Sequence, residues 1–221
     1  MEIVPSHLKN TYDVLQKLQQ IPKEDLAGRT FATADVEALY TNIVVQTAID
    51  DVMDFATEHK SSLALYGFKL VDIHELLEIT LLNSYFVYDR QVYHQLQGLF
   101  MGSRPAPIAA TIRMWKLERL SVYTDLRIKP VFYGRFYDDL NTGSTTARKA
   151  RLMCNAIEAQ DKDHLIKLKV DYPESRDSYT PFLNTEVKIE RDGTVNTRLF
   201  RKPQKKLLTL HTESHHSTAV K

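Results

Sequence analysis

The sequence has little of several residue types that mark special classes of protein. Its one cysteine, Cys154, permits no internal disulfide and no cysteine-rich zinc site. Only 7 glycines and 8 prolines occur in 221 residues, which excludes collagen-like and linker-like chains. No apolar run reaches the roughly 18 residues of a membrane span, and the charged, proline-containing start does not resemble a signal peptide. We therefore expect an intracellular protein, nuclear or cytoplasmic, with no membrane partner.

The remaining composition is that of an ordinary folded protein. Hydrophobic residues make up 43% and charged residues 26% of the chain, and 221 residues suit one large domain. The net charge is only +1, so the chain lacks the overall positive field of many nucleic-acid-binding proteins. Binding to a nucleic acid would have to depend on local clusters of basic residues.

Hydrophobic periodicity and turn residues predict a mixture of helices and strands. Helices are expected, the first with Ser6 as its N-cap, over residues 6–20, 47–59, 71–84, 105–123 and 145–160. Strands are expected over residues 30–34, 85–88, 91–94, 131–136, 165–170, 182–190 and 194–201. This order predicts an α+β fold in which helices pack on one face of a largely antiparallel sheet.

Carboxylates follow or interrupt two of these strands. Asp35 comes directly after an apolar strand, and Asp138 and Asp139 lie between apolar segments much later in the chain. Adjacent acids repel one another, and a bound cation such as Mg²⁺ would relieve the repulsion. Taken alone, the Asp138-Asp139 pair is explained better as a solvated turn.

Further short motifs occur in a fixed order along the chain. Between the acids, Gly98 and Gly102 would let the backbone approach a flat partner closely. In order, the motifs are Asp35-Val36-Glu37-Ala38-Leu39-Tyr40-Thr41-Asn42-Ile43, Gln95-x-x-Gly98-x-x-Met101-Gly102-Ser103, Phe136-Tyr137-Asp138-Asp139, Phe182-Leu183-Asn184, Phe200-Arg201-Lys202-Pro203 and Ser214-His215-His216. Together they resemble the palm motifs of the reverse transcriptase family, and most closely those of Penelope-like retroelement reverse transcriptases. The resemblance covers residues 33–216.

The resemblance implies a fold, a reaction and a cofactor. The fold would be polymerase palm-like (ferredoxin-like), with the palm at 30–203, a helical lead-in at 1–29 as a remnant of the fingers, and a tail at 204–221 leading toward an absent thumb. The reaction would be RNA-directed DNA synthesis, in which a primer 3′-hydroxyl attacks the α-phosphate of a dNTP. Two Mg²⁺ or Mn²⁺ ions would be the cofactors, and the partners would be an RNA or DNA template and a DNA primer.

The same resemblance implies roles for individual residues. The catalytic and metal-binding residues would be Asp35, Asp138 and Asp139, together with the carbonyl of Val36. The nucleotide-binding residues would be Tyr40, Gln95, Gly98 and Gly102. The primer and template would contact Phe136, Arg198, Arg201 and Lys202.

The residue types alone allow more than one role for some of these positions. The resemblance implies that Tyr40 packs against the sugar and excludes a ribose 2′-hydroxyl, whereas the residue type alone also suits an ordinary core tyrosine. The basic cluster near the C-terminus suits either phosphate contacts or a solvated basic face; its members are Arg198, Arg201, Lys202, Lys205 and Lys206. Three histidines suit a flexible tail better than a metal site; they are His211, His215 and His216.

Several features depart from the family pattern. The substitutions are Arg104 for a proline, Thr111 for a frequent asparagine and Asn184 for an aspartate. Only 34 residues precede Asp35 and few follow Pro203, so fingers, thumb or an endonuclease module would be supplied elsewhere. We therefore expect a truncated, retroelement-derived palm. The alternative is a catalytically inactive retroelement remnant that at most binds nucleic acid.

Overall fold

The computed structural model describes residues 3–175 and 177–201. In chain order, the elements are α1 (Thr11–Gln19), α2 (Lys23–Leu26), β1 (Thr30–Val36), α3 (Leu39–Asn42), α4 (Val45–Glu58), α5 (Leu70–Leu82), β2 (Tyr85–Tyr88), β3 (Gln91–His94), α6 (Ala106–Leu120), β4 (Tyr133–Phe136), β5 (Asp139–Ser144), α7 (Ala147–Glu158), β6 (Leu168–Asp171), β7 (Thr180–Phe182), β8 (Thr185–Ile189) and β9 (Val195–Leu199). Within this part of the chain, every helix is too short or too polar to cross a bilayer.

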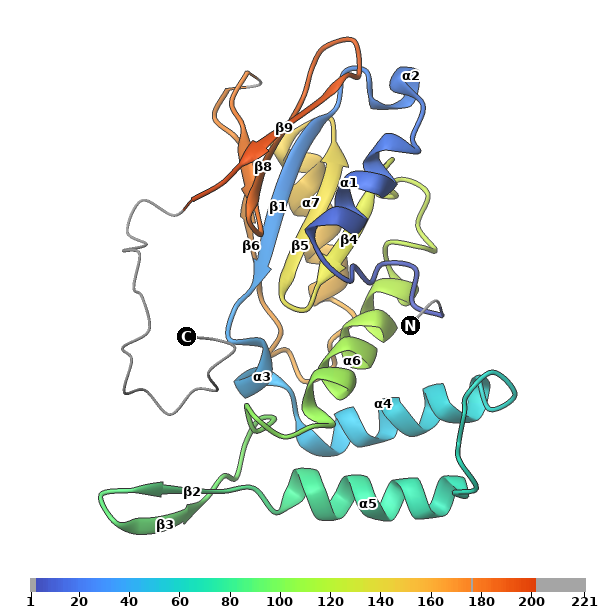
Figure 1. Cartoon of the computed structure of the whole chain (residues 1–221), viewed down its shortest axis with the longest axis vertical. Helices are drawn as coiled ribbons and strands as arrows, with labels where there is room; N and C mark the ends of the chain where they lie inside the picture. The colour runs from blue at the N-terminus through green and yellow to red at the C-terminus, as the bar shows by residue number, and fades with distance from the viewer. Residues whose placement is uncertain (1–2, 176, 202–221) are drawn as a thin grey trace, which may run out of the picture.

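The central sheet has four strands in the order β4-β5-β1-β6, and every neighbouring pair is antiparallel. Along the chain, β1, α6, β4, β5, α7 and β6 follow the β-α-β-β-α-β order of ferredoxin-like folds. Helices α6 and α7 cover one face of the sheet (Figure 1). The predicted α+β fold, an antiparallel sheet with helices packed on one face, is confirmed.

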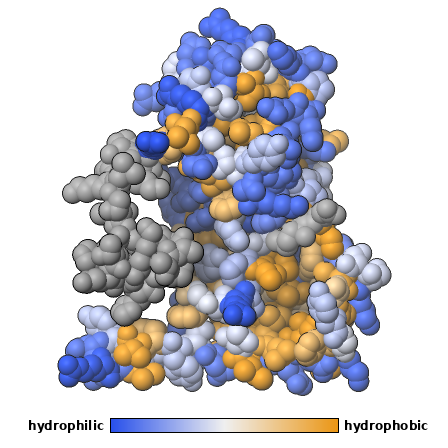
Figure 2. Space-filling model, viewed as in Figure 1, coloured by the Kyte–Doolittle hydropathy of each residue, from blue (hydrophilic) through white to orange (hydrophobic). Residues whose placement is uncertain are grey.

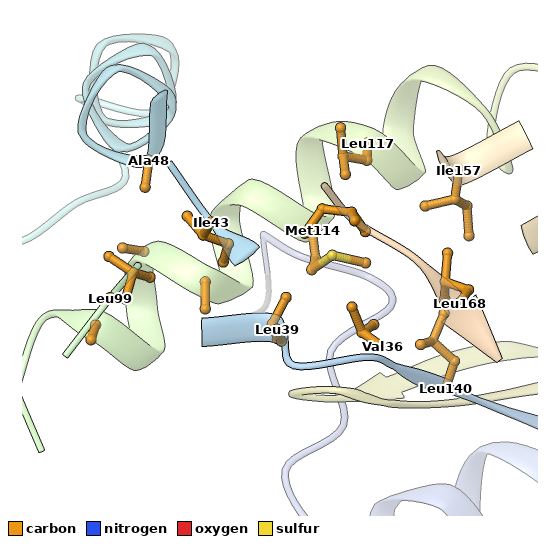
Figure 3. Packing of buried hydrophobic residues seen from close by; sticks show 14 of the residues in the cluster. Val36, Leu39, Ile43, Ala48, Leu99, Met114, Leu117, Leu140, Ile157 and Leu168 are labelled. Atoms are coloured by element: carbon orange, nitrogen blue, oxygen red, sulfur yellow. The ribbon is translucent and has the colours of Figure 1, made fainter. Parts of the chain in front are cut away.

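The alternation of side chains along β1 builds the core under these helices. Ala34 and Val36 point to the helical face and are buried there. Figure 3 shows Val36 and Leu140 of the sheet pointing toward Met114 of α6 and Ile157 of α7. Because apolar side chains close this face, the carboxylate between Ala34 and Val36 must lie on the other one.

The opposite face of the sheet carries a second core. Phe31 of β1 packs there against the rings of Phe132 and Phe182, at centroid distances of 6.4 and 6.1 Å. Apolar residues of α1 and of the three-stranded sheet β7-β8-β9 complete this core, among them Leu18 and Val187. The two cores therefore hold β1 from both sides.

Helices α4 and α5 and the β2–β3 hairpin form the lower part of the molecule in Figure 1. Helix α4 packs on α6, and α5 packs on α4 through its buried Leu77 and Leu81. The outer side of α5 leaves Val71 and Ile79 exposed. In Figure 2, hydrophobic residues accordingly reach the surface over the lower half of the view. The predicted strands 85–88 and 91–94 are confirmed, and they pair with each other as an antiparallel hairpin.

Three local predictions were wrong. The first helix is capped by Asn10, whose side chain accepts the amide of Asp13, whereas Ser6 is buried and donates to Glu118. Residues 182–190 form two strands, because a turn with Leu183 at φ 55° separates β7 from β8. Strand β6 begins only at Leu168, since the preceding amides of Leu165 and Ile166 both bind the Asp161 carboxylate at 2.8 Å.

Candidate active site

The three predicted catalytic acids meet at one end of the central sheet. Asp35 of β1 is the direct cross-strand partner of Asp139 of β5. The amide of Val36 donates to the carbonyl oxygen of Asp138 at 3.0 Å, which ties the β4–β5 turn to the end of β1. In Figure 1 this turn lies at the lower end of the sheet, above α3. The backbone therefore brings these residues together although they are far apart in the chain.

The electrostatics of the site favour a bound cation. Asp35 is exposed, yet partial burial and the nearby charges of Asp138 and Glu37 raise its pKa above the usual value for an aspartate. Lys169 of β6, the cross-strand partner of Asp35 on its other side, acts in the opposite direction. One lysine does not cancel the field of the surrounding carboxylates, so positive charge placed between Asp35 and Asp138 would be stabilised.

The turn that presents Asp138 has an unusual backbone. Phe136 and Asp139 are paired, so Tyr137 and Asp138 form a two-residue connection between β4 and β5. Tyr137 has φ 53°, a left-handed conformation that is strained for a residue with an aromatic side chain. The ring of Tyr137 lies edge-on to the ring of Phe136, with 4.9 Å between their centroids, and Phe136 is half-buried against the second core.

An open cleft of about 640 Å³ lies beside the acids. Its wall includes Asp35, Asp139 and Lys169. On the far side it is lined by the β7–β8 turn and by Phe200, directly after β9. The volume is in the range of ligand-binding clefts. A ligand in this cleft can therefore reach Asp35 and Asp139 from solvent.

The predicted nucleotide-binding residues are partly brought together. The backbone amide of Leu99 donates to the carbonyl of Tyr40 at 2.7 Å, and the side-chain Nε2 group of Gln95 donates to the carbonyl of Gly98 at 3.0 Å. Burial raises the pKa of Tyr40, with a further contribution from the nearby Tyr137 and Asp138. Tyr40 thus lies between the loop and the acids. Gly102 is exposed at φ 115° and makes no close contact with this group.

The predicted primer-binding residues lie on or after β9. Arg198 is paired with Glu186 of β8, and its guanidinium lies 4.1 Å from the centre of the Tyr179 ring. Its charge is thereby offset locally. Arg201 is exposed and follows Phe200, which lines the cleft. The other predicted residues of this region lie outside the described residues; they are Lys202, Lys205, Lys206, His211, His215 and His216.

The acids form a small ligand set. Within residues 3–175 and 177–201, no group of three or more His, Cys, Asp and Glu side chains is arranged to hold a metal ion. Asp35 and Asp138 lie near enough for the charge of Asp138 to raise the pKa of Asp35, and Val36, whose carbonyl could add an oxygen, follows Asp35 in the chain. Because Mg²⁺ takes only one or two protein carboxylates and retains several waters, this donor set fits it.

Two residues at the site were missed by sequence reasoning. Lys169 was expected only as part of a strand, and its pairing with Asp35 depends on a register that no local pattern reveals. Arg135 is fully buried and hydrogen-bonds to the turn that carries Asp138. The sequence did offer one signal for Arg135: a charged residue within a strand rich in aromatic residues indicates a buried cation with a specific partner.

Comparison with known proteins shows which solved structures have a similar fold. No family model and no curated protein sequence matches the chain. Among solved structures, apo telomerase from Candida tropicalis truncated from its C-terminal domain superposes with a TM-score of 0.63 at 13% identity, over 89% of this chain and 41% of that one. Telomerase from the same species, in complex with a TWJ fragment of telomeric RNA, gives 0.66 at 12% identity, over 93% and 36%.

A third structure agrees with these two. Telomerase from Candida albicans, in complex with a TWJ fragment of telomeric RNA, gives a TM-score of 0.62 at 13% identity, over 90% of this chain and 35% of that one. The chain thus spans about two fifths or less of the telomerase chains it resembles. Since telomerase is a reverse transcriptase, the chain has a reverse-transcriptase-like, nucleotidyltransferase-like fold.

Proposed function

We propose that the chain is the palm of an RNA-directed DNA polymerase, which adds a dNTP to a primer 3′-hydroxyl. The observation that carries the proposal is the convergence of Asp35 with Asp138 and Asp139 beside an open cleft. The reverse-transcriptase-like fold and the order of the motifs support the same class of enzyme. We further propose an origin in a Penelope-like retroelement, which rests on the sequence motifs alone.

In the proposed reaction, the primer oxygen forms a bond to the α-phosphorus of the dNTP while the bond to pyrophosphate breaks. No bond to the protein forms, so its residues act through position and charge. Asp35 and Asp138 would hold divalent ions. When bound, such ions neutralise the phosphate oxygens and favour deprotonation of the primer hydroxyl. Carboxylates held close together by β1 and the β4–β5 turn suit that task.

The substrates would lie along the cleft and over the neighbouring loop. Tyr40 would contact the sugar of the dNTP, because it lies between Asp138 and the Gly98 loop. Gln95 and Gly98 would face the base pair being formed. Phe200 and Arg201 at the far side of the cleft would contact the primer strand. An RNA template is consistent with the telomeric RNA fragments named for two of the similar structures.

The alternative proposal is an inactive remnant that only binds nucleic acid. It is favoured by the net charge of +1 and by the ion pairing of Arg198, which both weaken phosphate binding. It differs from the polymerase in one measurable respect, which is the absence of metal-dependent product.

A primer-extension assay separates the two proposals. The protein is incubated with a labelled DNA primer on an RNA template, all four dNTPs and Mg²⁺, and Asp138→Asn is compared with the parent. Asp50→Asn, an exposed change on α4, is the matched control. The polymerase predicts product from the parent and the control, and none from Asp138→Asn. Retained duplex binding with no product from any variant, in Mg²⁺ or Mn²⁺, would support the remnant instead.

A further inference from the structure

Arg135 is a fully buried arginine whose side chain hydrogen-bonds to the turn that carries Asp138. It lies in β4 with no exposed surface. Its Nη1 group donates to the carbonyl of Tyr137 at 2.8 Å, and its Nη2 group donates to the carbonyl of Thr111 in α6 at 3.0 Å. Its Nε group pairs with Glu118, which is also fully buried. All three guanidinium nitrogens therefore have fixed partners.

The carbonyl that accepts the hydrogen bond from Arg135 Nη1 belongs to Tyr137, the strained residue of the turn. Tyr137 is held at φ 53°, and such a conformation persists only where the surroundings fix it. The next carbonyl along the chain, that of Asp138, is fixed by the amide of Val36 at 3.0 Å. Arg135 and β1 thus hold two successive peptide groups, and between them they determine where the Asp138 side chain points.

The partner of Arg135 is itself held rigidly. The carboxylate of Glu118 accepts hydrogen bonds from the Ser6 hydroxyl at 2.5 Å and from the Tyr133 hydroxyl at 2.9 Å. The backbone of Arg135 also pairs with the N-terminal segment, through Ser6 at 2.7 Å and Leu8 at 2.8 Å. The lead-in, α6 and the catalytic turn therefore meet at one buried ion pair.

We propose that Arg135, anchored by Glu118, is a positioning residue that sets the turn so that Asp138 faces Asp35. This inference rests on the proposed function of the site and goes beyond it, because neither residue touches substrate or metal. An arginine is required because its planar, forked guanidinium donates to three acceptors at once. The single ammonium group of a lysine could not reach all three from one position. The charge balances Glu118, and the fork holds the Tyr137 carbonyl.

The variant Arg135→Lys tests the proposal, because it keeps the buried charge beside Glu118 and removes the fork. Binding of Mn²⁺ to the full chain is measured by electron paramagnetic resonance, and single-nucleotide addition gives kcat and the KM for dNTP. We expect Mn²⁺ affinity and kcat to fall by about 10- to 100-fold, with the KM for dNTP within about twofold of the parent value.

The matched control is Arg113→Met. Arg113 lies on α6, the helix that also carries Glu118. Like Arg135 it is buried and ion-paired, but its partners are Asp51 and Asp161, away from the turn. After this change Asp51 keeps its pairing with Lys116, and the Asp161 carboxylate keeps the hydrogen bonds from the amides of Leu165 and Ile166. We expect a lower thermal midpoint in this variant, with Mn²⁺ affinity and kcat per folded molecule unchanged. A purely structural role of Arg135 would give the same pattern for Arg135→Lys.

The outcomes separate this proposal from the proposed function. Equal Mn²⁺ affinity in folded parent and folded Arg135→Lys would overturn the positioning role, whatever the extension assay shows. If the parent extends no primer but Arg135→Lys still binds Mn²⁺ about tenfold more weakly, the proposed polymerase function fails and the positioning role is supported.

Discussion

Gly98 lies so close to Tyr40 that no side chain fits between them. A Cβ atom on Gly98 would lie 2.8 Å from the carbonyl oxygen of Tyr40 and 2.6 Å from the Cα atom of Thr41. Gly98 also has φ 81°, which other residues rarely adopt. The glycine therefore sets the distance between the loop after β3 and helix α3, and with it the place of Tyr40 beside Asp138.

This contact predicts that Gly98→Ala damages both stability and the site. The added methyl group would overlap backbone atoms of Tyr40 and Thr41, so the loop must move. We expect the free energy of unfolding to fall by about 2 kcal/mol. Gly67→Ala is the control, because Gly67 has a similar φ of 89° with nothing within 4 Å of its Cβ position. Urea denaturation measures the free energy of unfolding of both variants and of the parent. Equal losses in the two variants would contradict the close approach.

The location of Tyr40 predicts a change in sugar selection. If the ring contacts the sugar of the incoming nucleotide, Tyr40→Ala should raise the ratio of ribonucleotide to deoxynucleotide incorporation by about tenfold or more. Competition between labelled rNTP and dNTP in the extension assay measures this ratio. Unchanged discrimination would remove Tyr40 from the role and leave it as a packing residue.

The raised pKa of Asp35 predicts that its charge opposes folding when no metal is bound. Burial and the neighbouring acids favour the protonated form, so stability is lost as the pH rises through the pKa of Asp35. At neutral pH, Asp35→Asn should therefore raise the thermal midpoint by about 1–3 °C in the presence of a chelator. Added Mg²⁺ should raise the midpoint of the parent and leave that of the variant unchanged. A lower midpoint for Asp35→Asn in chelator would contradict this prediction.

His7 predicts a loss of stability in mild acid. Burial and the positive charge of the neighbouring Arg135 lower the pKa of His7. Below about pH 6.5 the unfolded chain therefore binds a proton that the folded chain resists, and the free energy of unfolding falls. Between about pH 6.5 and 5, the thermal midpoint of the parent should fall more than that of His7→Gln. Parallel curves would show that His7 does not contribute.

Much of the fold and part of the site could be predicted from the sequence. The approximate bounds of β1, β2, β3 and β4 follow from short runs of apolar and aromatic residues. These signals are local, so a linear reading finds them. The acids could be grouped because a resemblance to a family supplied the long-range pairing.

The remainder depends on contacts between distant segments. Ser6 has the features of a helix cap, but burial beside Glu118 of α6 gives it another partner, 112 positions away in the chain. Lys169 becomes a neighbour of Asp35 only through the register of β6. Arg135 can be assigned a role only once Tyr137 is seen at positive φ with its carbonyl bound. No local periodicity encodes any of these relationships.

The rate of single-nucleotide addition as a function of Mg²⁺ concentration tests the central claim most directly. Parent protein and Asp35→Asn are compared on the same RNA template and DNA primer, with the folded fraction of each measured in parallel. A polymerase centred on Asp35 predicts addition by the parent that requires Mg²⁺ and a rate at least about 100-fold lower for Asp35→Asn. Equal rates in the two proteins, or addition by the parent that is indifferent to the metal, would contradict it.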